Sequence, residues 1–311
     1  MTSSSTSPAQ TRLGLALGSI AGLGINRPRA DAPLARRVTG SDVTGVSYRV
    51  QAEHGVSTAS LAAGAARAAL RAAGANPADV EMVLVGTTTP DVMWPSTACL
   101  VQTELQLPMV ASFDLYAAET SVLAALNVAV RYVAAGARSV LLIGAESDNQ
   151  LVDLAGQGGT VHARAAAAAV LTPASGGGRV LSTMAGGAAR PQINADGQDR
   201  ILLQGLSEGV RDCLRKANLT LDDIDLVIAE QSAPEIMQAW SKQQAVSSTR
   251  LLLDPSRYGS LLAVAPLMAL HDAVVERRLR DGMTALLLGC GTGPVWAAAC
   301  LRWAGGGVAE W

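Results

Sequence analysis

One apolar pattern occurs twice in this chain, about 144 residues apart. Asp79–Pro90 (DVEMVLVGTTTP) and Asp223–Pro234 (DIDLVIAEQSAP) share the same order of acidic, apolar and small polar residues, and Ala137–Gly144 corresponds in the same way to Gly282–Gly289. In each case a short turn leads into a run that is apolar at every position. Such runs are typical of parallel strands that helices cover on both faces, and a repeat of this length predicts two similar α/β units in succession.

The boundary between the two units falls at the Pro- and Gly-rich run PASGGG, which begins at Pro173. We therefore predict an N-terminal half over residues 1–172 and a C-terminal half over residues 173–311. The chain has 311 residues, of which 49% are hydrophobic, and this is enough to bury one large core or two fused smaller ones. The predicted fold class is α/β.

Charge and hydropathy exclude several classes of partner. The 24 Lys and Arg residues nearly balance the 26 Asp and Glu residues, and they form no basic run, so no nucleic-acid partner is expected. No apolar run reaches the roughly 18 residues of a membrane span. The polar residues 1–11 lack the apolar segment of a signal peptide. We expect a cytoplasmic protein without a membrane partner.

The cysteines and histidines do not form a metal-binding pattern. No two cysteines have CxxC spacing, and the histidines are far apart, so we expect reduced thiols, no metal and no other cofactor. We also expect His271 to face solvent, on an amphipathic helix over Leu261–Arg280. The residues concerned are Cys99, Cys213, Cys290 and Cys300, with His54, His162 and His271.

Local signals predict several elements. An apolar run over Leu13–Leu23 predicts a first strand, and Thr58–Ala73 predicts a helix that Ser57 or Thr58 caps and Gly74 ends. The stretch Ser112–Gly144 predicts a strand, a tight polar turn, a long apolar helix and a second strand. Glu119 falls where that turn meets the helix N-terminus, a position at which a side chain is presented to a ligand.

Several sequence motifs in this chain resemble those of one family. They are VLVGTTTPDVMWPSTACLVQTEL over Val83–Leu105, SFDL from Ser112, AGARSVLLIGAES ending at Ser147, and LLLGCGTGPVWA over Leu286–Ala297. Together they resemble the β-ketoacyl-acyl-carrier-protein synthase III family of the thiolase fold, over roughly residues 12–305. The resemblance implies a five-layered αβαβα fold made of two similar halves. It also implies a homodimer or a heterodimer with a homologue, and acyl thioesters of coenzyme A or a carrier protein as substrates.

The family's cysteine, histidine and asparagine are all replaced here. In the motif that contains the family's nucleophilic cysteine, this chain has Glu119. In the motif that begins with the histidine it has Glu230, and in the motif that contains the asparagine it has Ser260. A thiolate at a helix N-terminus is a strong nucleophile, whereas a carboxylate is a weak one. Donors that would stabilise a thioester enolate are also lost. The resemblance therefore implies that a Claisen condensation through a cysteinyl acyl-enzyme cannot run here, and Glu119, Glu230 and Ser260 become the candidate catalytic residues.

The words that bind the coenzyme A nucleotide in the family have also changed. Asp42–Gly45 and Gln157–Thr160 stand at the two matching positions, and neither contains the family's arginine. Loss of these cations disfavours a phosphate-rich ligand. We therefore expect an acyl thioester on a carrier protein rather than on free coenzyme A.

The remaining candidates are pocket residues. In the family an aromatic side chain near the position of Trp94 crosses the dimer into the partner's acyl tunnel, and a simple interface anchor is the alternative role for Trp94. The glycine-rich turn could supply backbone oxyanion donors. The candidate substrate-pocket residues are Trp94, Thr120, Gln231, Gly289, Gly291 and Gly293.

Two interpretations of the site stay open. If Glu119 and Glu230 face each other in one desolvated cavity, they cannot both ionise cheaply, and one becomes an acid while the other is a base. Alternatively the site has decayed. Three functions follow: an acyltransferase or other acyl-thioester-processing enzyme of specialised polyketide or fatty-acid-derived biosynthesis, a non-catalytic partner of a competent homologue, or a carrier-protein or ligand-binding module.

Overall fold

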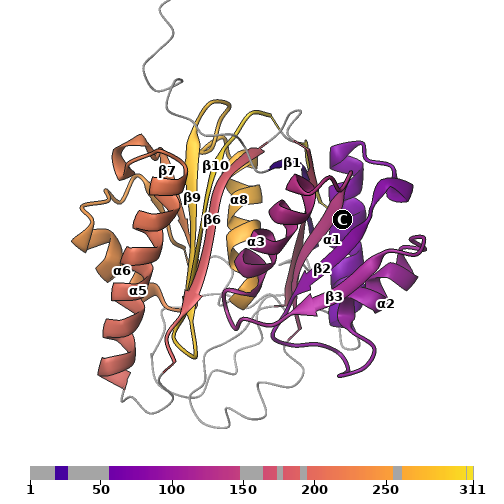
Figure 1. Ribbon diagram of the computed structural model, residues 1–311, viewed down its shortest axis with the longest axis horizontal. Helices are drawn as coiled ribbons and strands as arrows, with labels where there is room; N and C mark the ends of the chain where they lie inside the picture. Colours follow the sequence, from indigo (N-terminus) through magenta and orange to yellow (C-terminus); the bar gives the residue numbers. More distant parts are fainter. Residues whose placement is uncertain are drawn as a thin grey trace, which may run out of the picture.

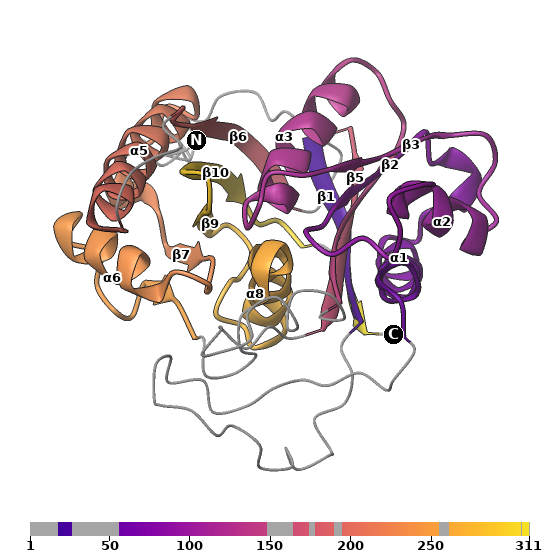
Figure 2. The ribbon, with the colours of Figure 1, turned by 90° about the horizontal axis from the view of Figure 1, so that it is seen from below.

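The protein has five layers, in which helices alternate with strands. The computed structural model describes residues 18–26, 56–147, 164–173, 178–189, 195–254, 261–305 and 307–310. Figure 1 shows α5 and α6 on one outer side, α1 and α2 on the other, strands inside them, and α3 and α8 in the centre. Seen from below in Figure 2, α3 and α8 again lie between the two groups of strands. The predicted αβαβα layered α/β fold is thus confirmed.

The helices and strands are bounded as follows. The helices are α1 (Thr58–Ala73), α2 (Thr97–Glu104), α3 (Ser121–Ala134), α5 (Ala195–Lys216), α6 (Pro234–Gln243) and α8 (Ala265–Val275), with short 3₁₀ turns η1 (Pro77–Asp79), η2 (Leu221–Asp223) and η3 (Leu262–Val264). The strands are β1 (Gly18–Asn26), β2 (Met82–Gly86), β3 (Ala111–Leu115), β4 (Val140–Glu146), β5 (Ala165–Thr172), β6 (Gly178–Gly187), β7 (Leu226–Ala229), β8 (Leu251–Leu252), β9 (Thr284–Gly291), β10 (Val295–Arg302) and β11 (Gly307–Glu310).

Hydrogen bonds join the strands in a mirrored order. The order is β3-β2-β4-β5-β1-β6-β10-β9-β7-β8, with β11 beside β1. At one end β3, β2 and β4 are parallel, and β5 is antiparallel to β4. At the other end β8, β7 and β9 are parallel, and β10 is antiparallel to β9. The turns η1 and η2 precede the equivalent strands β2 and β7, at the spacing of the sequence repeat. This order is the one that two similar halves would produce, although the boundary at residue 173 stays a prediction.

Three apolar clusters hold the layers together. The central cluster joins α3 and α8 to both groups of strands, a second packs α1 and α2 on β2, β4 and β5, and a third packs α5 and α6 on β6, β7, β9 and β10. Strands β4 and β9 are buried along their whole length, because helices cover both of their faces. This burial explains why their sequences are apolar at nearly every position.

The first predicted helix has the predicted ends. Helix α1 spans Thr58–Ala73, the Ser57 side chain accepts from the Ser60 backbone N–H, and Gly74 adopts the left-handed conformation with φ of 59°. A serine oxygen satisfies one of the free N–H groups of the first turn, and glycine takes the left-handed cap without steric cost. Both signals act within a few residues of the chain, so the sequence alone locates this helix.

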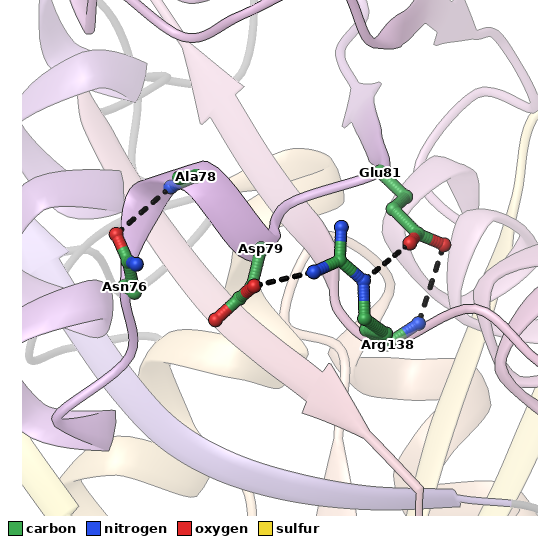
Figure 3. A network of polar contacts seen from close by, with 5 residues as sticks. All are labelled: Asn76, Ala78, Asp79, Glu81 and Arg138. Atoms are coloured by element: carbon green, nitrogen blue, oxygen red, sulfur yellow. Dashed lines mark hydrogen bonds and ion pairs between the residues drawn. The ribbon is translucent and has the colours of Figure 1, made fainter.

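A surface ion-pair network ties the starts of β2 and β4 together. Arg138 Nε lies 2.7 Å from Glu81 Oε1, and its Nη1 lies 2.6 Å from Asp79 Oδ1 (Figure 3). In the same network the Asn76 side chain accepts from the Ala78 backbone N–H at the start of η1. These contacts fix the entry into both parallel strands, and they lie at the end of the sheet opposite to the candidate site.

Several sequence-based expectations are corrected or fall outside the described residues. The expected helix Leu261–Arg280 is shorter: η3 is followed by α8, which ends at Val275. The expectation that His271 faces solvent is wrong. Helix α8 lies in the central layer between the two groups of strands, and His271 is only 1% exposed, beside Asp272. The first strand is displaced toward the C-terminus and covers Gly18–Asn26. Residues 13–17 and the words at 42–45 and 157–160 lie outside the described residues.

No helix in the described part of the chain is both long and apolar enough to span a membrane. Within the same ranges, no three His, Cys, Asp or Glu side chains are grouped so that they could hold a metal ion. Three cysteines, Cys213, Cys290 and Cys300, are buried free thiols, whereas Cys99 is half-buried.

Candidate active site

Glu119 lies at the N-terminal end of α3, on the tight turn that the sequence predicted. The turn is closed by hydrogen bonds from the backbone N–H groups of Thr120 and Ser121 to the carbonyls of Ala117 and Ala118. Ala118 has a φ of 48°, which is uncommon for a residue with a side chain. The hydroxyl of Thr120 donates to the Ala117 carbonyl, at 2.7 Å, so it stabilises the turn. The helix N-terminus favours a negative charge at Glu119.

The carboxylate of Glu119 is bound by the glycine-rich turn of the C-terminal half. Its Oε2 accepts from the Thr292 backbone N–H at 2.8 Å, and its Oε1 accepts from the Thr292 hydroxyl at 3.0 Å. Only a glycine fits at residue 291, because a Cβ there would lie 1.9 Å from Glu119 Oε2. The sequence predicted that backbone N–H groups of this turn could bind an oxyanion. In the structure the Thr292 N–H donates to Glu119 instead.

Glu230 follows the end of β7 and is completely buried, with 0% of its surface exposed. Its Oε1 accepts from the Ser232 backbone N–H, and among the described residues no group donates to or accepts from its Oε2. Burial is the largest cause that raises the pKa of Glu230, to about 8; hydrogen bonds from Ser232 oppose the shift, and the charge of Glu119 adds to it. Glu230 is therefore mostly protonated at neutral pH.

Strand β9 brings the two glutamates to one place. A Cβ at Gly289 would lie 3.9 Å from Glu230 Cβ and 3.5 Å from Thr120 Cγ2, and a Cβ at Gly291 would collide with Glu119. The two glycines are two residues apart and face the same way, so these contact points are separated by about 7 Å along the strand. The central helix α3 and the end of β7 thus meet over β9, one from each half of the chain.

The other predicted site residues have different places. Gly293 lies in the turn after β9 with φ of 89°, a conformation that favours glycine. Gln231 is buried beside Glu230, and its Oε1 has no hydrogen-bond partner among the described residues. Ser260 lies outside the described residues, so its predicted role stays a prediction.

Trp94 lies at the surface on the loop between β2 and α2. The loop is anchored on both sides: Asp91 accepts from the backbone N–H groups at the start of α1, and Asp114 accepts from those at the start of α2. Between these anchors Met93 is 81% exposed and Trp94 is 83% exposed. The neighbouring strand β3 is at the end of the sheet, and its Phe113 is also exposed. A firmly held apolar loop beside the edge strand β3 is a surface that a partner chain could cover.

A third buried glutamate, Glu146, was not singled out from the sequence. It ends β4 and is buried, and its carboxyl group accepts from the Thr88 backbone N–H and from the hydroxyls of Thr88 and Thr89 at 2.8–3.2 Å. Burial raises its pKa to about 7, and these hydrogen bonds together with one from the Ala263 backbone oppose the shift. Glu146 thus joins the loop that leads to Trp94 with η3 of the other half. The only sequence signal was its place at the carboxyl end of a parallel strand.

Comparisons with known proteins agree on one family. Residues 113–188 match the family described as 3-Oxoacyl-[acyl-carrier-protein (ACP)] synthase III, and residues 214–303 match the family described as its C terminal part. A β-ketoacyl-[acyl-carrier-protein] synthase III of Roseiflexus castenholzii is 32% identical, over 93% of this chain and 98% of the relative. The corresponding protein of Natranaerobius thermophilus is 29% identical, over 84% of this chain and 89% of the relative.

Solved structures show the same relationship. The crystal structure of 3-oxoacyl-[acyl-carrier-protein] synthase III from Aquifex aeolicus VF5 has a TM-score of 0.78 at 25% identity, covering 92% of this chain and 100% of that one. OleA of Xanthomonas campestris, in a structure with bound cerulenin, has a TM-score of 0.83 at 18% identity, covering 92% of this chain and 96% of that one, which shows a shared fold.

Proposed function

This chain belongs to the 3-oxoacyl-[acyl-carrier-protein] synthase III family, and from that premise we propose that it transfers an acyl group from a thioester to an acceptor, with Glu119 and Glu230 in place of the family's triad. One observation carries the proposal: two carboxyl groups meet over β9 in different surroundings. Glu119 is exposed in part and held by donors, whereas Glu230 is buried and its pKa is raised to about 8. A base and an acid in one site are what acyl transfer without a covalent intermediate requires.

The proton transfers of the proposed reaction balance. Glu119 takes a proton from the O–H or N–H of the acceptor as its oxygen or nitrogen forms a bond to the thioester carbon. As the carbon–sulfur bond breaks, Glu230 gives its proton to the leaving thiolate, so that an ester or amide and a free thiol are the products. Glu119 then holds one additional proton and Glu230 one fewer, and exchange with water restores both. General acid–base catalysis of this kind contributes about 10²–10⁴ in rate.

The acyl donor in this proposal is a thioester on a carrier protein, and the setting is a specialised polyketide or fatty-acid-derived pathway in the cytoplasm. The absence of arginine from the words at 42–45 and 157–160 supports the carrier protein over free coenzyme A. A homodimer, or a heterodimer with a homologue, would cover the exposed apolar loop at Trp94.

A second function is favoured by a different observation. Because Glu119 already fills the Thr292 donor, the site could be silent, and the chain would then be a non-catalytic partner that supplies Trp94 to a competent homologue. A carrier-protein or ligand-binding module without chemistry is the remaining alternative. The two glutamates speak against both, since a buried carboxyl group is costly and is not needed in a silent site.

Turnover by the purified protein alone tests the proposal. The protein is incubated with acyl thioesters of a carrier protein and of coenzyme A, together with alcohols and amines as acceptors. We expect thiol release and acylated acceptor from the native protein, and a loss of at least a hundredfold in both Glu119→Gln and Glu230→Gln. Glu235→Gln, on the exposed start of α6, is the matched control. Turnover that persists in both site variants would sink the carboxylate mechanism, and a co-purifying homologue with a cysteine nucleophile would favour the partner function.

A further inference from the structure

Among the described residues, the charged groups that act on the candidate site are carboxylates. Cys290 lies between the two site glycines on β9. Burial is the largest cause that raises its pKa, and the carboxylates of Glu230, Glu119 and Asp199 add to the shift. For Glu230 too, the charged group that acts on it is a carboxylate, that of Glu119. A ligand with a carboxylate of its own would add a further negative charge to this place, at a cost that low polarity increases.

The site also contains buried side-chain oxygens that have no hydrogen-bond partner among the described residues. Glu230 Oε2 is buried and has no hydrogen-bond partner among the described residues, and the same is true of Gln231 Oε1. A buried polar oxygen without a partner is costly, and a cation that displaces the proton of Glu230 and donates to the ionised carboxylate removes that cost. Glu119, by contrast, has both oxygens bonded to Thr292 and lies beside the N-terminus of α3, a helix end that favours a negative charge. The site therefore offers one carboxyl group that is held in place by donors and, over the same strand, one buried carboxyl oxygen without a partner.

From this juxtaposition we propose that the acceptor substrate is a primary amine, which enters as an ammonium ion between Glu119 and Glu230, and that carboxylated ligands are rejected. An ammonium group has three donors and a positive charge, so it can pair with Glu119, displace the proton of Glu230 and donate to the ionised carboxylate. An alcohol has one donor and no charge, and a carboxylate has neither a donor nor a suitable charge. The inference rests on the proposed acyl transfer, because it names the acceptor of that reaction. Glu119 takes one proton from the ammonium ion, and the free amine then forms its bond to the thioester carbon. The second N–H proton passes to the ionised Glu230, which gives it to the leaving thiolate as the carbon–sulfur bond breaks, so that an amide and a free thiol are the products and the proton on Glu119 returns to water.

Binding of three matched probes to the full-length protein tests the inference. Hexylamine, hexan-1-ol and hexanoate have equal chain lengths and differ only in the head group. We expect titration calorimetry at pH 7 to show that hexylammonium binds at least tenfold more tightly than hexan-1-ol, and that hexanoate does not bind. Hexanoate binding as tightly as hexylammonium would overturn the inference, and this comparison needs no variant.

Two variants and one signature locate the bound head group. Glu230→Gln and Glu119→Gln should each weaken hexylammonium at least tenfold, while Glu235→Gln, which removes one exposed negative charge nearby, should leave it unchanged. Because an ammonium ion favours the ionised form of Glu230, binding should release a proton at pH 7, and this release should disappear in Glu230→Gln. Equal binding by all variants, or no proton release from the native protein, would place the amine elsewhere and refute the proposal.

These outcomes are separate from those of the proposed function. A protein that binds hexylammonium through both glutamates but turns over no thioester would refute the acyl transfer and leave the amine site intact. A protein that acylates alcohols and does not bind the amine would refute only the amine site.

Discussion

Glu119 and Thr292 are 173 residues apart in the chain, and two hydrogen bonds of 2.8 and 3.0 Å join the carboxylate of one to the backbone N–H and hydroxyl of the other. The contact connects the N-terminus of α3 in the first half with the glycine-rich turn of the second half. It orients the carboxylate over β9, where its charge adds to the shift that raises the pKa of Glu230.

Replacing Gly291 by alanine should expel Glu119 from this position. The new Cβ would lie 1.9 Å from Glu119 Oε2, so the side chain must leave and both hydrogen bonds to Thr292 are lost. We expect the free energy of unfolding to fall by about 1–3 kcal/mol, and thioester turnover to be lost.

Gly289→Ala is the matched control, because its Cβ would meet the end of the flexible Leu123 side chain at 3.2 Å. Urea denaturation and the turnover assay compare the two variants. Equal effects would show that overpacking of β9, and not the displacement of Glu119, is responsible.

The stability of the protein should fall as the pH rises through the neutral range. Glu230 has a folded-state pKa of about 8, raised by burial from 4.5, so its protonated form is favoured by folding. Its contribution is fully present below pH 4.5 and is lost as the pH rises to about 8, at up to about 1.4 kcal/mol per pH unit.

Denaturation of the native protein and of Glu230→Gln at pH 5, 7 and 9 measures this contribution. The glutamine variant should lose less stability between pH 5 and 9 and should keep the part that is due to Glu146, whose raised pKa is about 7 and acts with the same sign. Identical pH dependence in the two proteins would mean that Glu230 is not buried as described.

Glu146→Gln should destabilise the protein strongly. The carboxyl group accepts from three donors of Thr88 and Thr89, and an amide NH₂ in its place would face a donor. An unsatisfied buried donor costs about 1–3 kcal/mol, and we expect a loss within or above that range.

The comparison for this variant is Glu81→Gln, which removes an exposed carboxylate that pairs with Arg138. Exposed ion pairs contribute little, so its melting temperature should stay close to that of the native protein. If both variants had the same melting temperature, the hydrogen bonds of Glu146 would contribute no more to stability than the exposed ion pair of Glu81.

Trp94→Ala should weaken self-association. The side chain is 83% exposed in the single chain, next to the exposed Met93 and the edge strand β3, so a dimer that covers this surface would depend on it. Sedimentation equilibrium should show a dimer of the 31.8-kDa native chain and at least a tenfold weaker one for the variant.

Tyr132→Ala, which removes a partly exposed aromatic side chain from α3, should leave the dimer unchanged. A monomeric native protein would contradict the prediction and leave the apolar loop for a different chain.

Local and repeated signals made most of the fold predictable. The apolar runs at β2, β4, β7 and β9 and the caps of α1 depend on neighbouring residues alone, and the repeat indicated that the runs belong to two related sets. His271 was misjudged for the opposite reason: its helix is enclosed on all sides, and a helix in the central layer has no solvent face for a hydrophobic pattern to reveal.

The sequence alone determined that the chain is α/β, that it resembles a thiolase-fold family and that glutamates replace the family's cysteine and histidine at residues 119 and 230. Only the tertiary structure decided what those glutamates contact. Glu119 takes the Thr292 donor, Glu230 is buried and its pKa is raised, and Glu146 joins two loops from different halves. Residue types and short-range order are written in the sequence, whereas burial and the pairing of groups more than a hundred residues apart arise only when the layers pack.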